Sequence, residues 1–417
     1  MKKITLFATA CSFTAATFAV MGGDVESDTG KIILNDKVPA LVVPVVDIRA
    51  RYEYGGFHGA GPDLEDAHAG TIRERIGLRT RKIRGFQGYV EYEGTQTVDR
   101  QSYRADSVHG PTNKVVIADP ESNELNQGWL SYTAPSDVWG LKVGRQAINI
   151  DDQRYIGGVA WRQNMQTFDS VIVNWNPTDD LEFSYYNIWQ VNRVFGSDVF
   201  VPAFTDFTGS SHLVHGKVKN LPFGTLTGYV YSLDLHNTAG DTNSNTSFGA
   251  ILEGPVFDTD LTYYLEAAHQ IDAYSNPQDY AANYAHVYFS GNVCESTTAS
   301  IGFEYLGSDN GVGYKFPLGT NHAYNGFGDL FLVTPPGGLT DSYIKLATKV
   351  PGDIGLAAFY HFFTDDGFDT GFGQEADVVA TREITENVSL LAKGAWFFGQ
   401  SGFPDVTRAS IEMDYKF

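Results

Sequence analysis

The chain has 417 residues, a formal net charge of −21 and a mean hydropathy of −0.20, although Phe (28), Tyr (23) and Gly (44) are abundant. The negative charge argues against nucleic-acid binding and indicates acidic, solvated loops. The only cysteines are Cys11 and Cys294. Because Cys11 lies in an N-terminal apolar segment, the mature chain has a single cysteine and cannot form an internal disulfide.

That N-terminal segment has the pattern of a secretory signal. Lys2 and Lys3 precede an apolar run from Ile4 to Val20, and small residues follow near 19–23. We therefore predict a signal peptide over 1–22 and one domain over 23–417. Apolar sequence continues past Cys11, which argues against lipidation there. Beyond residue 20, no apolar run approaches the roughly 18 residues that a membrane-spanning helix needs.

The rest of the chain predicts about eighteen strands, an even number as in single-chain bacterial barrels. They are expected over about 43–54, 71–81, 86–94, 124–133, 138–146, 168–176, 180–190, 211–218, 223–234, 247–253, 261–271, 281–290, 298–306, 339–349, 353–363, 375–384, 388–397 and 404–417. Short links such as 135–137 and 351–352 alternate with long ones such as 147–167 and 307–338. This alternation is typical of periplasmic turns and extracellular loops, so both chain ends are expected on the periplasmic side. Cys294 is expected in a short periplasmic link.

The last strand shows the alternation most clearly. Residues of one parity from Arg408 to Lys416 are polar, those of the other parity from Ile411 to Tyr415 are apolar, and the chain ends on Phe417. In lipid every backbone polar group must pair internally, so a membrane sheet has to close. The sequence thus predicts an all-β fold, a transmembrane antiparallel β-barrel in the bacterial outer membrane. Its partners would be the lipid bilayer and lipopolysaccharide, and its long extracellular loops would fold partly into the lumen.

Arginines dominate one parity of strand 71–81. A midplane arginine facing lipid costs about 2–4 kcal/mol, so these side chains are expected inside the barrel. The polar faces of strands 43–54, 71–81 and 86–94 together carry six cations, Arg49, Arg51, Arg73, Arg75, Arg79 and Arg81, and four carboxylates, Asp47, Glu53, Glu91 and Glu93. Two hypotheses remain open. The charges could form a salt-bridge lattice that stiffens the wall, or the surplus cations could form a track that selects anions. On other strands, four more cations have the parity of lumen-facing residues: Lys142, Lys345, Lys393 and Arg408.

Catalytic signals are weak. The sequence has no GxSxG motif, no Walker loop and no evident metal-ligand cluster, and Glu266 and His269 would lie on opposite faces of a strand. His212 with Ser210 or Ser211 could be read as a serine-histidine site. With ten histidines and many serines in the sequence, such pairs arise by chance, and we expect no site there. We therefore predict no enzymatic activity and no cofactor. The acidic residues Asp365, Asp366 and Asp369 lie in or beside an outer loop, where Ca²⁺ bridging to lipopolysaccharide is conceivable.

Two long loops carry distinctive motifs, GRQAINIDDQRYIGGVAWRQN at 144–164 with QTFD at 166–169, and FPLGTNHAYNGFGD at 316–329. Together with ADPE at 118–121 before ELNQ at 124–127, these resemble the alginate export family of outer-membrane proteins. The resemblance implies an eighteen-stranded monomeric barrel with an arginine-rich constriction for a polyanionic polysaccharide. It also implies that Arg145, Arg154 and Arg162 line or brace the constriction, with Asp152 and Asp169 in the same stretch. Arg145 has the parity of outward residues, so it needs a bulge or the start of the loop to reach the lumen.

We therefore expect a channel for passive diffusion of anionic solutes, such as an acidic polysaccharide or oligosaccharide like alginate. One alternative is a porin for small neutral or aromatic nutrients, which a narrow lumen lined by Tyr and Trp would favour. Alternatives of another class are an outer-membrane hydrolase, which needs a nucleophile beside a base, and a sealed barrel that acts as an adhesin.

Overall fold

The computed structural model describes residues 41–417, apart from 61–62, 106–108, 198, 200 and 258. The predicted signal peptide lies outside the described residues. Eighteen strands form one sheet, and β14 and β15 form a separate two-stranded hairpin. The strands are β1 (Val42–His58), β2 (Ala67–Thr80), β3 (Phe86–Thr97), β4 (Ser122–Thr133), β5 (Trp139–Gln146), β6 (Thr167–Thr178), β7 (Leu181–Asn192), β8 (Phe207–Leu221), β9 (Gly224–Leu233), β10 (Asn245–Pro255), β11 (Leu261–Asp272), β12 (Ala281–Cys294), β13 (Thr297–Leu306), β14 (Ser308–Asp309), β15 (Val312–Gly313), β16 (Leu339–Val350), β17 (Ile354–Thr364), β18 (Gly371–Thr385), β19 (Val388–Gly399) and β20 (Asp405–Lys416). Two short 3-10 helices span Pro202–Phe204 and Asn321–Ala323.

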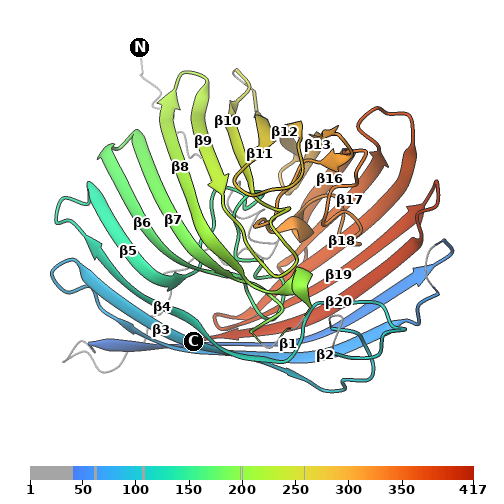
Figure 1. Cartoon of the computed structure of the whole chain (residues 1–417), viewed down its shortest axis with the longest axis horizontal. Helices are drawn as coiled ribbons and strands as arrows, with labels where there is room; N and C mark the ends of the chain where they lie inside the picture. The colour runs from blue at the N-terminus through green and yellow to red at the C-terminus, as the bar shows by residue number, and fades with distance from the viewer. Residues whose placement is uncertain (1–40, 61–62, 106–108, 198, 200, 258) are drawn as a thin grey trace, which may run out of the picture.

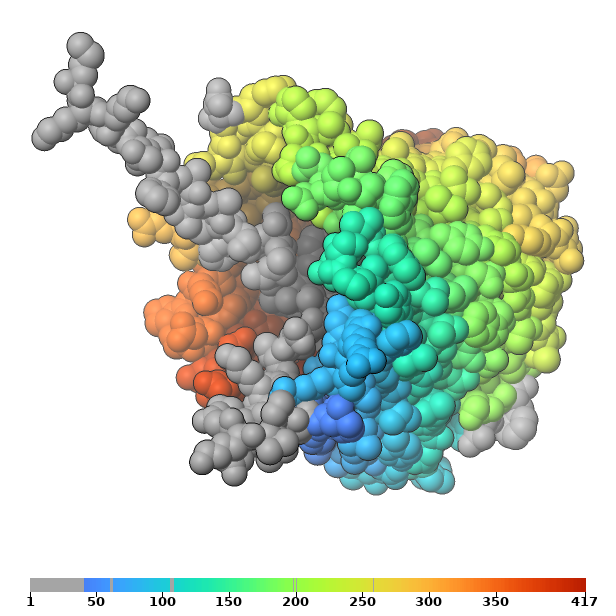
Figure 2. All heavy atoms as spheres, turned by 90° about the vertical axis from the view of Figure 1, so that its left-hand side faces the viewer, coloured from blue at the N-terminus to red at the C-terminus, as the bar shows by residue number. Residues whose placement is uncertain are grey.

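The sheet closes on itself. Each strand of the sheet pairs antiparallel with the next along the chain, β13 pairing with β16, and β20 pairs with β1 from Asp47↔Lys416 to His58↔Asp405. Closure leaves no strand edge with unpaired backbone groups, which is the condition for a sheet in lipid. The strands curve around a common interior in Figure 1, and the colours of the chain follow one another around a ring in Figure 2.

The prediction of eighteen antiparallel strands in a barrel is confirmed, and the predicted strand ends lie within a few residues of the observed ones. Short turns and long loops alternate as expected, so the two described chain ends lie at the turn end. Cys294 differs slightly from expectation. It is the last residue of β12 and not part of a link, because the ladder continues through a bulge to pair Cys294 with Thr297. Its thiol is exposed and free.

The outer face of the barrel is apolar. Outward side chains such as Ile76 (54% exposed), Leu78 (52%) and Ile411 (57%) alternate with buried polar residues such as Arg73. The predicted lipid-facing parity is therefore confirmed for β2 and β20. In the described residues no helix has the length and apolar character to cross a membrane.

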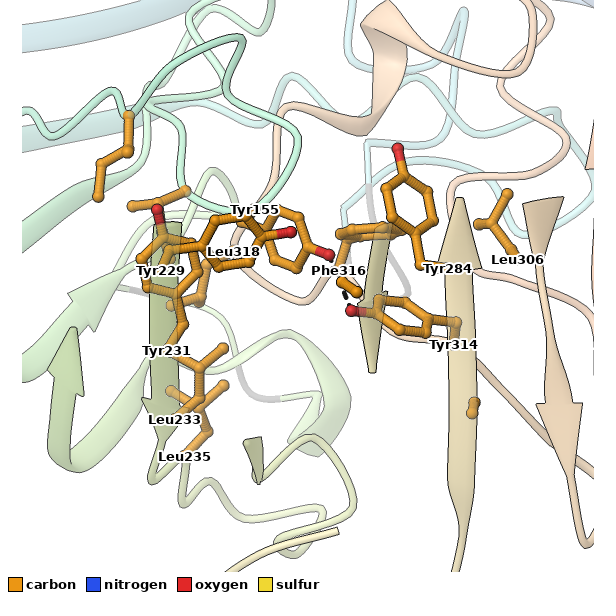
Figure 3. Close-up of a cluster of buried hydrophobic side chains, with 14 of the residues drawn as sticks. Tyr155, Tyr229, Tyr231, Leu233, Leu235, Tyr284, Leu306, Tyr314, Phe316 and Leu318 are labelled. Carbon is orange, nitrogen blue, oxygen red and sulfur yellow. Dashed lines mark hydrogen bonds between the residues drawn. The ribbon is translucent and has the colours of Figure 1, made fainter. Parts of the chain in front are cut away.

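Two loops fill the interior of the barrel, the segment 147–166 between β5 and β6 and the segment 307–338 between β13 and β16. Ile156 and Leu318 join them in a parallel bridge, and both are fully buried. They belong to the largest cluster of buried apolar side chains, which lies inside the barrel, between the loops and strands β6–β13 and β16–β20. Figure 3 shows part of it. The expectation that loops fold into the lumen is confirmed.

Candidate functional site: the loop-filled lumen

The arginines of β1 and β2 form a buried ion-pair lattice. Arg49 Nε lies 2.8 Å from Asp414 Oδ1, and Arg51 Nη2 lies 2.7 Å from Glu412 Oε2. In the same lattice, Arg73 pairs with Asp47 and Arg75 pairs with Glu93. All four arginines are at most 5% exposed. Guanidinium groups with so little contact with solvent interact mainly with the carboxylates paired with them.

The predicted surplus of positive charge on this wall is wrong. Strand β20 closes the barrel beside β1 and adds Glu412 and Asp414, and the loop before β4 adds Asp119, which lies 3.4 Å from Arg51. With Asp47, Glu53, Glu91 and Glu93, the carboxylates are no fewer than the arginines. The count from three consecutive strands failed because the fourth strand of the wall is the last in the sequence. The salt-bridge lattice is therefore the arrangement that the structure contains.

This lattice also holds the 147–166 loop. Arg49 Nη1 donates to the Ala160 carbonyl at 2.8 Å, and Arg51 donates to the carbonyl of Trp161. The loop also donates to the wall, since the backbone N–H of Met165 donates to Glu93 Oε1 at 3.1 Å. Arg49, Arg51 and Glu93 are thus shared between neighbouring strands and the loop. Moving the loop requires new partners for several buried charges, which is costly.

Arg154 and Arg162 lie inside the lumen and connect the two loops to the wall. Arg154 Nε is 2.8 Å from Glu304 on β13, and its guanidinium lies over the rings of Phe316 and Tyr324, 4.1 and 4.4 Å from their centroids. Arg162 Nη2 is 2.8 Å from Asp329 Oδ2. Burial alone would lower the pKa of both arginines, but the adjacent carboxylates raise it, so both remain charged.

His322 extends the Arg162–Asp329 pair to β19. Lys393 Nζ donates to His322 Nε2 at 2.8 Å, so Nδ1 carries the proton and donates to Asp329 Oδ1 at 2.5 Å. The imidazole stacks on Trp161, with centroids 4.3 Å apart. Burial, together with Lys393 and Arg162, lowers the pKa of His322 to about 4 despite Asp329. His322 is therefore neutral at physiological pH and acts as a relay of hydrogen bonds between loop and wall.

The remaining predicted site residues lie elsewhere. Arg145 keeps the outward parity of β5, and its ladders to β4 and β6 run without a bulge there. It pairs with Asp169, Nε to Oδ1 at 2.7 Å. The expectation that Arg145 reaches the lumen is therefore wrong, because the regular ladder preserves its parity. Glu91 is buried and accepts from Asn126 at 2.7 Å. Arg79 is half-buried near the turn end of β2, across from Tyr89.

The family-model comparison matches the alginate export model over residues 45–317. This chain belongs to the alginate export family. A comparison with curated protein sequences found no significant match. Family membership, the closed barrel and its apolar outer face place the protein in the bacterial outer membrane as a porin-like channel.

The fold also matches solved outer-membrane porins of Pseudomonas aeruginosa. OpdQ is 13% identical with a TM-score of 0.63, covering 91% of this chain and 99% of its own. OccK9 (OpdG) is 12% identical with a TM-score of 0.67, covering 90% and 98%. OccK2 (OpdF), solved in complex with glucuronate, is 12% identical with a TM-score of 0.65, covering 90% and 96%. At these identities the likeness concerns the fold.

The opposite wall of this alginate export family barrel is rich in tyrosine. Tyr155 of the first lumen loop donates to or accepts from Tyr314 of the second at 2.8 Å, and both lie among Tyr229, Tyr231 and Tyr284 of the wall (Figure 3). Each of these five tyrosines is at most 9% exposed. They form packing between loops and wall, and their rings are covered. This cluster therefore does not line the lumen with exposed tyrosine rings, the arrangement that would favour a porin for aromatic nutrients.

Sequence reasoning missed one cluster on that wall. Asp152, Glu266 and His286 each offer a ligand atom, and these atoms lie within 4.8 Å of one another. Burial and the neighbouring Asp151 raise the pKa of Asp152. The sequence analysis compared Glu266 with His269 on the same strand, whereas its cross-strand partner is His286. The signal was present, since the predicted hairpin of strands 261–271 and 281–290 places these two residues opposite each other.

The outer-loop aspartates are held by hydrogen bonds within the chain. Asp365 Oδ1 accepts from the backbone of Asp369 at 2.8 Å, and Asp366 Oδ2 accepts from Ser308 Oγ at 2.8 Å. Within the part of the chain that the structure describes, they form no group of three metal ligands, and Asp152, Glu266 and His286 are the one such group. Calcium bridging to lipopolysaccharide stays a prediction.

The serine-histidine pair lies on the outside of the barrel. Ser210 Oγ is 3.3 Å from His212 Nε2, and His212 Nδ1 is 2.8 Å from the hydroxyl of Tyr185. His212 has the parity opposite to the fully buried Leu213. Among the described residues no carboxylate contacts His212, so no acid orients its imidazole as in a Ser-His-Asp triad.

Proposed function

We propose that this porin-like channel passes anionic organic solutes by passive diffusion, with ring-bearing carboxylates such as uronic acids and their oligomers as the preferred class. Alginate is a polymer of this kind. Such a channel has no turnover, and its selectivity comes from the width of the passage and the charges along it.

The observation that carries this proposal is a set of inward cations beside aromatic rings, between the lumen loops and the turn end. Lys142 Nζ lies 4.2 Å from the ring centroid of Trp129, and Lys345 Nζ lies 5.1 Å from that of Phe359. Arg79 is the cross-strand partner of Tyr89. A cation attracts a carboxylate, and an adjacent ring offers an apolar face to the sugar or aromatic ring that carries it.

Two comparisons support the same class of solute. The family is named for alginate export, and OccK2 binds glucuronate, a sugar carboxylate. OpdK, also of this fold, was solved with vanillate, an aromatic carboxylate. The buried lattice of β20, β1, β2 and β3 plays a different part in this proposal. It holds the loops that set the width of the passage, while the half-buried cations act on the solute.

The test is the reversal potential of the purified channel in a KCl gradient across a planar bilayer. We expect an anion-selective parent, and we expect the double variant R79E/K142E to lose roughly threefold or more of the anion-to-cation permeability ratio, because fixed cations raise the local anion concentration. Glucuronate added on one side should reduce the chloride current of the parent and should affect the double variant less.

Arg382→Glu is the matched control, since Arg382 is exposed near the turn end of β18. Its reversal of charge should leave selectivity unchanged. A cation-selective parent, or equal selectivity in parent and double variant, refutes the preference for anions and leaves a neutral-solute porin. A parent without conductance refutes the channel and favours a sealed barrel.

A further inference from the structure

A cluster of metal-ligand type forms where the 147–166 loop meets the tyrosine-rich wall. Asp152 comes from the loop, Glu266 from β11 and His286 from β12, and their ligand atoms lie within 4.8 Å of one another. Glu266 and His286 are 4% and 5% exposed. Two carboxylates and one imidazole form a mixed oxygen and nitrogen donor set, which suits first-row transition metals better than Ca²⁺ or Mg²⁺.

The negative charge of this cluster lacks a cationic partner. Glu266 accepts from Tyr229 at 2.6 Å and from Tyr264 at 2.7 Å, and both donors are neutral hydroxyls. Elsewhere in the lumen, buried acids such as Glu304 pair with an arginine. In the described part of the chain, no Lys, Arg or His side chain forms an ion pair with Asp152 or Glu266, and Asp152 Oδ1 accepts from the backbone N–H of Arg154 at 3.1 Å. Two buried carboxylates side by side are costly unless a cation compensates them.

A second and independent observation concerns the imidazole. His286 Nδ1 is buried and has no hydrogen-bond partner, whereas Nε2 lies 3.0 Å from the hydroxyl of Tyr343. A metal-bound histidine usually offers one nitrogen to the ion and donates from the other to a neighbouring oxygen, which orients the ring. His286 has that arrangement, with Nδ1 left for an ion. An unpartnered buried nitrogen otherwise costs free energy.

We propose that Asp152, Glu266 and His286 bind one divalent transition-metal ion, with Zn²⁺ as the reference ion. Metal–ligand bonds of about 2.0–2.2 Å require the three ligand atoms to converge further, and Asp152 would exchange its long contact with the hydroxyl of Tyr264, at 3.4 Å, for a bond to the ion. The ion would balance the two carboxylates and tie the 147–166 loop to β11 and β12. This inference does not depend on which solute the channel passes.

The test is calorimetric titration of the full, metal-stripped chain in detergent with Zn²⁺ alone. Both parent and variants carry Cys294→Ala, so that the exposed thiol cannot bind the ion. We expect one saturable site in the parent and at least tenfold weaker binding in Glu266→Gln and in His286→Gln. His361→Gln is the matched control, because His361 is another buried lumen histidine but contacts Asp341 with Nδ1 at 2.9 Å. Its Zn²⁺ affinity should equal that of the parent.

Resistance to protease and heat-dependent mobility in gels show which variants have assembled. If one does not assemble, the visible spectrum of Co²⁺ added to the parent decides the question. A spectrum that differs from that of aqueous Co²⁺ and is displaced by one equivalent of Zn²⁺ supports the site. No saturable binding in the parent, an aqueous Co²⁺ spectrum, or unchanged affinity in both assembled variants overturns it.

Discussion

The two halves of the lumen wall hold the same two loops by different chemistry. On the wall of β20, β1, β2 and β3, buried arginines and carboxylates neutralise one another, and the arginines donate to the backbone of the 147–166 loop. In the buried lattice of this wall, each of Arg49, Arg51, Arg73 and Arg75 therefore has a carboxylate beside it. On the wall of β9 to β12, tyrosine rings and hydroxyls make the contacts, and among the described residues no arginine forms an ion pair with Glu266. The tyrosine wall is well packed, and the acids Asp152 and Glu266 lie side by side on it, which is where we propose that a metal cation binds.

The largest effect is expected on the charged wall. Arg51→Ala removes the shortest ion pairs of buried Glu412 and Asp119 and leaves them only the longer ion pairs with Arg49 and Arg162, at 3.8 and 3.9 Å. Breaking a buried pair on one side typically costs about 3–5 kcal/mol. The free energy of unfolding, measured by urea titration in detergent, should fall accordingly. Arg382→Ala, at an exposed position, should change it by less than about 0.5 kcal/mol. Equal effects of the two substitutions would contradict the idea that the lattice is the main anchor.

The second effect depends on pH and concerns His322, which connects the 307–338 loop to Lys393 on β19. The folded chain keeps His322 neutral down to a pKa of about 4, whereas an unfolded histidine binds a proton near 6.5. The folded state therefore binds fewer protons, and the free energy of unfolding should fall as the pH drops from 6.5 to 4, by at most about 3 kcal/mol since one pKa unit is about 1.36 kcal/mol. Unfolding of the parent and of His322→Gln should be compared across this range. A parallel decline in both chains would show that other groups cause it.

A third effect tests the contact of the 307–338 loop with β18. Gly326 has φ +86°, and an added Cβ would lie 2.5 Å from the carboxylate of Glu375. Gly326→Ala should destabilise this contact by about 1–3 kcal/mol, as overpacking does, and should increase cleavage of the loop in limited proteolysis. Gly337→Ala is the control from the same loop, because nothing lies within 4 Å of its added Cβ. Similar cleavage of both variants would count against a tight loop contact.

The smallest effect is expected on the tyrosine wall. Tyr155→Phe keeps the ring in its cluster and removes the hydroxyl that bonds Tyr314. Loss of one neutral hydrogen bond costs about 0.5–1.5 kcal/mol, well below the cost of Arg51→Ala. The measurement is the same urea titration. If Tyr155→Phe were as damaging as Arg51→Ala, the contrast between a charged anchor and a packed one would disappear.

Much of the barrel could be predicted from residue order, because the alternation of polar and apolar residues is a local property of a strand between lipid and lumen. The eighteen strands, the lipid-facing side of Ile76 and Ile411 and the inward side of Arg73 follow from it. The motifs of the two loops, which are also local in the sequence, indicated the family. Hairpin symmetry, applied to residues 261–290, would also have paired Glu266 with His286.

The balance of charge could not be predicted in this way, because it depends on contacts between segments far apart in the chain. Glu412 reaches Arg51 only because the barrel closes, and Asp329 reaches Arg162 only because two loops fold into one lumen. Asp152 meets Glu266 and His286 for the same reason. Strand parity determines which side of the wall a residue faces. Barrel closure and loop packing determine which charges are neutralised and which are left to bind something else.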